Sequence, residues 1–176
     1  SFPTRRSSDL ILHWGVSEAN EDYLRRANAV CPISIVENSY SILNRKNEAL
    51  IPFLEEFNIG WAAFSPLMKG LLTNRFEKGV SFAPDDWRGH AVNDANLDRT
   101  ERLRNYLNEL AMQKDTTVSA LSLSWILHRK PYIVPIPGMK KRERLTENAQ
   151  AADLVLSKAE MDIIETIVAS MEAENG

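Results

Sequence analysis

The sequence has little of several features that would assign a protein class at once. Among its 176 residues there is one cysteine, Cys31, so no disulfide can form within the chain, and a reducing, cytoplasmic setting fits best. Beside an apolar run, Cys31 is expected to be a buried small hydrophobe rather than a nucleophile. The longest apolar stretches, such as IGWAAFSPLM at 59–68, fall far short of the roughly 20 residues that cross a bilayer, so no membrane helix is expected.

The sequence also lacks a large excess of charge. The 21 Lys and Arg nearly balance the 24 Asp and Glu, which leaves a formal net charge of -3 and no general attraction to nucleic acid or anionic lipid. Any anion site must therefore be local. One segment stands out, PIPGMKKRERLTEN at 135–148, in which four basic residues follow a Pro-Gly turn: Lys140, Lys141, Arg142 and Arg144. No metal site is expected.

The first ten residues need separate treatment. The segment SFPTRRSSDL matches, at every position, the translation of a sequencing-library adapter. A natural basic targeting peptide would have to match it by chance, so we treat 1–10 as non-native and 11–176 as the protein domain. On this interpretation the natural N-terminal part is missing.

What is present is an alternation of short apolar runs and helical patterns, in a chain whose size and 44% hydrophobic composition suit one domain. The apolar runs predict strands at 11–17, 33–37, 60–65 and 132–136. Amphipathic patterns predict helices at 19–30, 47–57, 100–114, 118–130 and about 140–150, and a last helix that opens with a capping box of Ser157 and Glu160. The polar stretch from 68 to 98 predicts a long functional or mobile loop.

The helix patterns also predict caps and buried faces. Ser17 or Asn20 is expected to cap the first helix, and Thr117 the helix at 118–130. The helical period predicts that four side chains of the first helix and four of the second share an inward face: Tyr23, Leu24, Ala27 and Val30, then Leu50, Phe53, Leu54 and Phe57.

Alternating strands and helices indicate an α/β fold built from parallel βα units. A small doubly wound sheet would be complete at this length, whereas a (β/α)8 barrel needs roughly 250 residues and would be about half present. No G-x-G-x-x-G motif follows any predicted strand, which weakens the dinucleotide-binding version of the first architecture.

Four motifs favour the barrel. HWGVSEAN, VENSYSIL, WAAFSPLMKGLLT and IVPIPGMKKRERLTENAQAA occur in the order and spacing of the last four strands of the aldo-keto reductase barrel. From Ile11 to its end, the chain resembles the C-terminal half of a (β/α)8 TIM barrel of the aldo-keto reductase family. Each motif alone is weak, and their common register is what makes the resemblance specific.

The resemblance implies hydride transfer from NADPH to a small carbonyl compound, with a Tyr acid assisted by Lys, Asp and His. In the family these four residues lie on the first half of the barrel, so no catalytic residue is expected in this chain. The tyrosines and histidines that are present do not match the catalytic positions, and structural or surface roles are expected for them: Tyr23, Tyr40, Tyr106, Tyr132, His13, His90 and His128.

Part of the cofactor site is expected to remain. By resemblance, Ser17, Glu37 and Asn38 lie near the nicotinamide carboxamide, and Phe64 faces the nicotinamide ring, with a plain core aromatic as the alternative for Phe64. Glu37 departs from the Gln that is common in the family, and an ionised carboxylate can accept from the carboxamide NH2 but cannot donate to its oxygen.

The remaining cofactor positions lie in two segments. By resemblance, Ser65, Leu67 and Gly70 meet the pyrophosphate. Gly138, Lys140 and Arg144 belong to the segment that holds the 2'-phosphate, and Glu147 and Asn148 reach the adenine. Met139 stands where relatives often have Ser or Thr, so one hydroxyl contact is lost. Lys141 and Arg142 are interpreted as solvated charges.

Together these features predict part of a cytoplasmic, NADPH-dependent aldo-keto reductase, inactive as this chain alone. One alternative is a non-catalytic relative that senses the cofactor, like the β subunits of potassium channels, and another is a free-standing half-barrel interaction domain. The substrate and the oligomeric state are not readable from the sequence. Exposed apolar strand edges at 11–17 and 132–136 predict association or molten behaviour of the isolated half.

Overall fold

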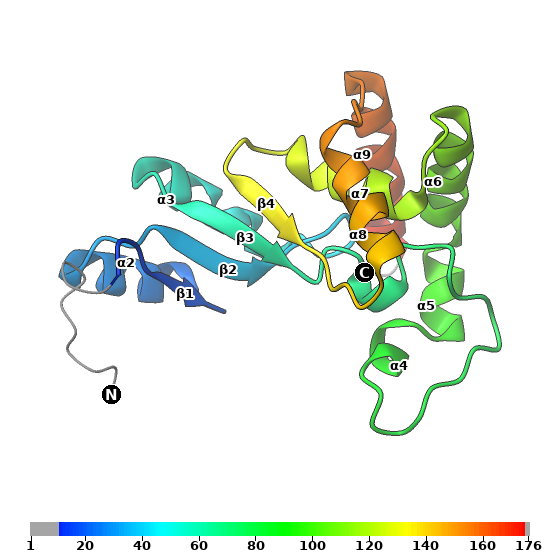
Figure 1. Cartoon of the computed structure of the whole chain (residues 1–176), viewed down its shortest axis with the longest axis horizontal. Helices are drawn as coiled ribbons and strands as arrows, with labels where there is room; N and C mark the ends of the chain where they lie inside the picture. Colours follow the sequence, from blue (N-terminus) through cyan, green and yellow to red (C-terminus); the bar gives the residue numbers. More distant parts are fainter. Residues whose placement is uncertain (1–10, 175–176) are drawn as a thin grey trace.

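The computed structural model describes residues 11–174 and contains one parallel four-stranded sheet. Its strands are β1 (Gly15–Ser17), β2 (Ile35–Ser39), β3 (Gly60–Phe64) and β4 (Ile133–Ile136). They lie side by side in the order β1-β2-β3-β4, which is their order in the sequence (Figure 1). The predicted α/β fold with four parallel strands is confirmed, although β1 is shorter than the predicted strand at 11–17.

Helices connect and follow the strands. After β1 comes α2 (Glu21–Val30), and β2 is followed by the 3-10 turn η1 (Lys46–Leu50) and α3 (Ile51–Glu56). Between β3 and β4 lie η2 (Met68–Gly70), α4 (Arg88–Ala91), α5 (Asp94–Arg99), α6 (Glu101–Gln113) and α7 (Val118–Leu127). After β4 come α8 (Arg142–Ala149), η3 (Gln150–Ala152) and α9 (Lys158–Ala173). Figure 1 shows α6, α7, α8 and α9 gathered beyond β4, with α4 and α5 below them.

The predicted helix starts are confirmed where a side chain caps them. The Asn20 side chain accepts from the Tyr23 N–H, so Asn20 rather than Ser17 caps α2. Thr117 caps α7 by accepting from the Ala120 N–H. Ser157 and Glu160 form the predicted reciprocal capping box at the start of α9. Each cap satisfies an N–H group that the helix itself leaves without a partner.

The two faces of the sheet differ sharply in burial. On one face Val36, Trp61 and Ile133 are at most 1% exposed, and they belong to the main core with side chains of α2, α3, α6, α7 and α9. On the other face, Ile35 is 43% and Val134 54% exposed. Because successive side chains of a strand point to opposite faces, this difference means that helices cover only one side of the sheet.

Several predicted buried positions are wrong. In α2, Leu24 is fully buried and Ala27 half-buried, but Tyr23 and Val30 are exposed, because only a narrow stripe of this short edge helix meets the sheet. Phe57 is 40% exposed, since α3 ends at Glu56 and the chain turns toward β3. Three of the four side chains predicted to face inward from the helix at 47–57 are buried: Leu50, Phe53 and Leu54.

Cys31 is also not the buried hydrophobe that was predicted. It is half-buried, and its backbone N–H donates to the Ala27 carbonyl at 3.0 Å at the end of α2. The residue follows the last turn of a surface helix and precedes the apolar run that becomes β2. Its place at this helix end accounts for its partial exposure.

The segment from 68 to 98 is more ordered than the predicted loop. It contains η2, α4 and most of α5, and it has a small core of its own in which Leu71, Val92 and Leu97 are at most 3% exposed. Phe76 and Phe82 pack against this cluster and meet edge to face, with ring centroids 5.3 Å apart. Sparse apolar residues can therefore hold a long connection when they converge on one point.

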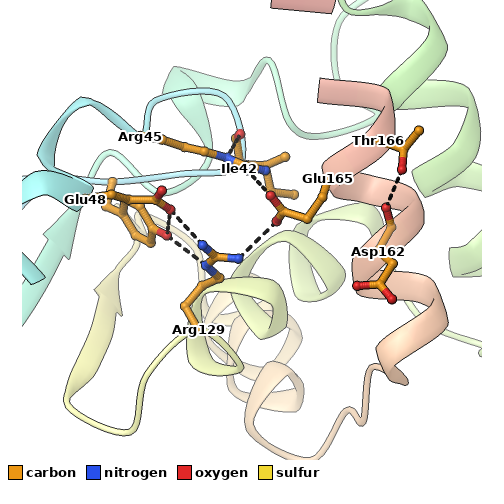
Figure 2. Close-up of polar contacts among 8 residues, drawn as sticks. Ile42, Arg45, Glu48, Arg129, Asp162, Glu165 and Thr166 are labelled. Atoms are coloured by element: carbon orange, nitrogen blue, oxygen red, sulfur yellow. Dashed lines mark hydrogen bonds and ion pairs between the residues drawn. The ribbon is translucent and has the colours of Figure 1, made fainter. Parts of the chain in front are cut away.

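An ionic network ties the segment after β2 to α9. The Arg129 guanidinium donates to Glu48 at 3.0 Å and to Glu165 at 3.1 Å, and Glu165 also pairs with Arg45 (Figure 2). The Tyr40 hydroxyl donates to Glu48 at 2.5 Å. Both arginines also lie over the Trp125 ring. The guanidinium carbon is 4.8 Å from the ring centroid for Arg45 and 5.1 Å for Arg129.

Within residues 11–174, no helix is long and apolar enough to cross a bilayer.

Candidate functional site

The carboxyl ends of the four strands share one edge of the sheet, because all pairings are parallel. Ser17 is in register with Glu37, and Ser39 with Phe64, which in turn is in register with Ile136. Residues that end separate strands are thereby brought together at one rim. Ligands of parallel α/β folds bind at this rim, so it is the first place to look for a site.

At the β1–β2 end of the rim, the structure brings the predicted residues into contact. The Ser17 hydroxyl donates to the Glu37 carbonyl oxygen at 3.1 Å, and the Glu18 N–H donates to the same oxygen at 3.0 Å. The Glu37 side chain is exposed. A carboxylate that stands open at the rim can accept hydrogen bonds from a ligand.

Asn38 has a different environment from its neighbour. It is 2% exposed, its side-chain oxygen accepts from the Ala19 N–H at 3.1 Å, and its side-chain nitrogen donates to the Ala19 carbonyl at 2.8 Å. The Trp61 indole donates to the Asn38 carbonyl at 3.0 Å. Asn38 therefore clamps the segment after β1 to the end of β2, and a positioning role fits it better than direct contact with a ligand.

The segment that follows β3 is strained. Ser65, Met68 and Lys69 have φ values of 52°, 48° and 56°, in the left-handed region that residues with a side chain rarely adopt. Gly70 has a φ of 110°, and a Cβ there would lie 2.6 Å from an edge atom of the Phe76 ring. The chain therefore needs glycine at this position. Strain of this kind persists where surrounding structure holds it, and it is typical of ligand-binding loops.

Leu67 holds this loop against the rest of the fold. It is half-buried and packs on the cluster of Ala120, Leu123 and Ala151, which links the end of β3 to α7 and η3. Phe64 is also half-buried at the end of β3. Part of its ring is thus available at the rim.

The basic segment that begins at Lys140 forms the start of α8. Lys141 occupies the N-cap position without a side-chain hydrogen bond to the helix, so no side chain caps its first N–H groups. Lys140 is exposed, whereas Arg144, Glu147 and Asn148 are half-buried on the helix. A Cβ on Gly138 would have no atom within 4 Å, so this glycine lies in open space.

Two arginines of the long 68–98 segment converge on this helix start. Partial burial, followed by the positive charges of Arg144 and Arg88, lowers the pKa of Arg75. Arg88 lies beside Asp86, and its hydrogen bonds to that carboxylate, with a smaller contribution from Lys140, hold the pKa of Asp86 at about 2. Arg75 therefore lies within electrostatic reach of Arg88 and Arg144, and Asp86 within reach of Lys140, while the acid Glu147 partly offsets the positive charge at Arg75.

The sequence analysis missed Arg75 and Arg88. Both lie in a segment that was predicted as a loop, and nothing in their spacing relates them to Lys140 and Arg144, which follow much later in the sequence. The one available signal was the length of that segment, since long connections are often functional.

The histidine and tyrosine side chains have structural partners instead of a common site. His128 Nδ1 donates to the Ser124 carbonyl at 2.8 Å, and Nε2 accepts from the Leu156 N–H at 3.3 Å. His13 contacts the Ser34 hydroxyl at 3.1 Å. The Tyr132 hydroxyl donates to Glu55, and partial burial together with this bond raises the pKa of Tyr132 to about 12. Among the described residues, no group of three or more His, Cys, Asp or Glu could hold a metal ion.

Comparisons with known proteins agree with this architecture. Residues 7–169 match the profile of the aldo/keto reductase family. An aldo-keto reductase of Strobilurus tenacellus is 30% identical over 169 residues, which are 92% of this chain and 50% of that protein.

Two solved structures share the fold. The glycerol dehydrogenase of Gluconobacter oxydans superposes with a TM-score of 0.83 at 21% identity, over 92% of this chain and 50% of that one. An aldo/keto reductase of Klebsiella pneumoniae, crystallised with NADP and acetate, has a TM-score of 0.68 at 22% identity, over 90% of this chain and 48% of that one. The chain thus spans about half the length of these relatives. It belongs to the aldo/keto reductase family, and its four strands and helices form half of that family's TIM barrel.

Proposed function

We propose that this chain is the C-terminal half of an NADPH-dependent aldo-keto reductase and that it carries much of the cofactor site. In this proposal the 2'-phosphate lies at the start of α8, held by Lys140 and Arg144, with Gly138 leaving space and Glu147 and Asn148 reaching the adenine. Arg75 and Arg88 supply further positive charge from the 68–98 segment. The bound cofactor supplies the hydride that reduces a small carbonyl compound.

The observation that carries the proposal is the convergence of Arg75, Arg88 and Arg144 on one helix start. Partial burial is the largest cause of the lowered pKa of Arg75, and the positive charges of Arg144 and Arg88 lower it further, against an opposing effect of Glu147. A phosphate relieves the repulsion between these arginines, and arginine can hold it with two parallel hydrogen bonds. A second chemical class, such as nucleic acid, fits less well because the cluster is short and the chain as a whole is acidic.

The rim residues complete the proposed site. Phe64 offers part of an aromatic face to the nicotinamide ring, and Ser65, Leu67 and Gly70 shape the strained loop that meets the pyrophosphate. Ser17 and Glu37 lie where the carboxamide is expected, with Asn38 fixing the backbone between them. An ionised Glu37 accepts from the carboxamide NH2, so the carboxamide oxygen needs another donor. The Ser17 hydroxyl serves as that donor only if it gives up its present bond to the Glu37 carbonyl oxygen.

No residue of this chain is assigned to proton transfer. Burial and then the hydrogen bond to Glu48 raise the pKa of the Tyr40 phenol well above its ordinary value, and Arg129 also contacts that hydroxyl at 3.1 Å. Tyr132 and His128 are likewise held by structural bonds. We therefore expect the chain to reduce no carbonyl compound with NADPH above the rate without protein.

The test compares two cofactors by calorimetric titration of the 176-residue chain. Arg144→Ala removes one or two charge-assisted hydrogen bonds, each worth roughly 1.5–3 kcal/mol, so NADPH affinity falls by about tenfold to a few hundredfold. NADH lacks the 2'-phosphate, and its affinity changes little. Equal losses for both cofactors, or no loss for either, contradict the assignment.

Arg142→Ala is the matched control. Arg142 belongs to the same helix turn and carries the same charge, but it is exposed and is interpreted as a solvated residue. Its removal is expected to reduce NADPH affinity by no more than about twofold, through long-range charge alone. If Arg142→Ala loses as much NADPH affinity as Arg144→Ala, the cofactor is attracted by the general positive charge of this region and not by a specific contact with Arg144.

A further inference from the structure

Glu37 carries the only charged side chain among the residues of the four described strands. Successive side chains of a strand point to opposite faces, and Val36 and Ala63 are fully buried on the face that the helices cover. Glu37 and Phe64 therefore lie on the other face. The register sets Glu37 opposite Ala62, two residues before Phe64 on the neighbouring strand, so one negative charge and one aromatic ring are close together at the rim.

The carboxylate of Glu37 has no role in holding the fold together. Within the described part of the chain, no ion pair or hydrogen bond includes its side-chain oxygens, although its backbone carbonyl accepts from the Ser17 hydroxyl and the Glu18 N–H. Ala62, directly opposite, has no side chain long enough to come between Glu37 and Phe64. The charge is thus available to a ligand that lies at this rim.

The two oxidation states of a nicotinamide cofactor differ in charge at the ring alone. The ring is a positively charged pyridinium in NADP+ and is neutral in NADPH, whereas the phosphates are the same in both. A carboxylate within hydrogen-bond reach of the ring carboxamide attracts the pyridinium and has no comparable attraction to the neutral ring. The pyridinium also withdraws electrons from the carboxamide, whose NH2 then donates a stronger bond to a carboxylate.

We propose that Glu37 makes the cofactor site favour the oxidised cofactor, NADP+, over NADPH. The inference rests on the proposed function, which places the carboxamide beside Glu37. Only an interaction that differs between two states can shift their balance, and contacts to the phosphates do not differ. The same charge favours loss of hydride from the bound cofactor to the carbonyl substrate, since the ring becomes positive as the hydride leaves.

The test is calorimetric titration of the 176-residue chain with NADP+ and with NADPH, for the original protein and for Glu37→Gln. Gln has nearly the shape of Glu, so the substitution removes the charge and keeps the packing. We expect the ratio of the NADPH dissociation constant to the NADP+ dissociation constant to fall about tenfold in Glu37→Gln, because NADP+ binding weakens while NADPH binding changes little. A tenfold change in this ratio is a shift of about 30 mV in the potential of the bound two-electron couple.

Glu18→Gln is the matched control. Glu18 follows β1 at the same rim and its backbone N–H donates to the Glu37 carbonyl oxygen, but it lines a small hollow with Lys46 and Asn47. Loss of its charge is expected to change the ratio of the two dissociation constants by no more than about twofold, through long-range charge alone.

A ratio that stays the same or rises in Glu37→Gln overturns the proposal, and so does an equal fall in Glu18→Gln. The comparison of NADPH with NADH separates this failure from a failure of the cofactor site. If Arg144→Ala weakens NADPH binding alone while Glu37→Gln leaves the ratio unchanged, the site stands and the role of Glu37 is wrong. If the chain binds neither oxidation state, the proposed function fails and this inference fails with it.

Discussion

Two groups of arginines in this chain have opposite surroundings. Arg45 and Arg129 lie over the Trp125 ring and are bonded to Glu48 and Glu165 (Figure 2). In the second group, Arg75 and Arg144 have no carboxylate pair within 4 Å among the salt bridges of the described residues, and Arg88 is paired with Asp86. In the first group charge is matched inside the fold, whereas in the second much of it is left unmatched at the surface.

The difference indicates how the same side chain serves stability in one place and binding in another. A partly buried guanidinium without a carboxylate partner loses hydration that nothing replaces, so the fold supplies Glu48 and Glu165. A guanidinium that keeps part of its hydration can exchange that water for a ligand. The following predictions test this division, in order of expected effect.

The largest effect is expected from Arg129→Met. Its loss leaves Glu48 and Glu165 with one partner fewer each, in a region where the paired side chains are only 25–34% exposed. Removing one partner of a fully buried ion pair costs about 3–5 kcal/mol. Because these side chains are partly exposed, we expect Arg129→Met to lower the free energy of unfolding by about 2 kcal/mol. The measurement is urea denaturation followed by circular dichroism at fixed protein concentration.

Arg26→Met is the control for Arg129→Met. Arg26 pairs with Asp22 on the surface of α2, and both side chains are more than 70% exposed. Its replacement is expected to change the unfolding free energy by less than about 0.5 kcal/mol. Equal effects of the two substitutions would remove the distinction between the two arginine groups.

A smaller effect, on binding alone, is expected from Arg75→Ala. Arg75 is exposed, and its recorded contact is with the Phe76 ring, whose centroid is 5.3 Å from the guanidinium carbon. We expect NADPH affinity to fall about tenfold, which is 1.4 kcal/mol, with little change in stability. Arg75→Lys keeps the charge and should recover part of the affinity. A stability loss comparable to that of Arg129→Met would place Arg75 in the structural group.

The smallest effect is expected from Asp86, the acid at the edge of the basic group. Its pKa is lowered to about 2 from an ordinary 3.8, chiefly by hydrogen bonds from Arg88. A carboxyl group with a lowered pKa adds stability above its unfolded pKa and loses that contribution as pH falls through about 2. Asp86→Asn should therefore lower the urea midpoint slightly at pH 6 and by less at pH 3. If the difference in urea midpoint between the original protein and Asp86→Asn stays constant or widens toward pH 3, the hydrogen bonds from Arg88 are not what lowers the pKa of Asp86.

The fold was largely predictable because the four strands and the longer helices have strong local signals, whereas α4 and α5 were not predicted. The runs at 33–37 and 60–65 differ from β2 and β3 by two residues or fewer at each end, and the capping box marks the start of α9. The buried faces were less predictable. Tyr23, Val30 and Phe57 have the period of a core-facing stripe, but α2 and α3 are short and cover only one side of an open sheet.

The site was predictable where the residues are contiguous in sequence. The basic segment around Lys140 and Arg144 can be read as a helix start with clustered charge, and α8 begins at Arg142. The approach of Arg75 and Arg88 to the start of α8 could not be predicted from the sequence, since it depends on how the 68–98 segment packs on its own small core. The local clamp between Asn38 and Ala19 was likewise invisible, because residue type alone does not reveal which hydrogen bonds are already taken.

The sequential strand order has a consequence for how the chain folds. Each strand pairs with its neighbour in sequence, and the β1–β2 and β2–β3 pairings are much closer in sequence than the β3–β4 pairing, so we expect them to form first. The Arg45–Glu165 pair joins residues 120 positions apart and must wait until α9 docks. Contacts that form after the rate-limiting step affect unfolding more than folding. We therefore expect that loss of the ionic network speeds unfolding of the half-barrel more than it slows folding.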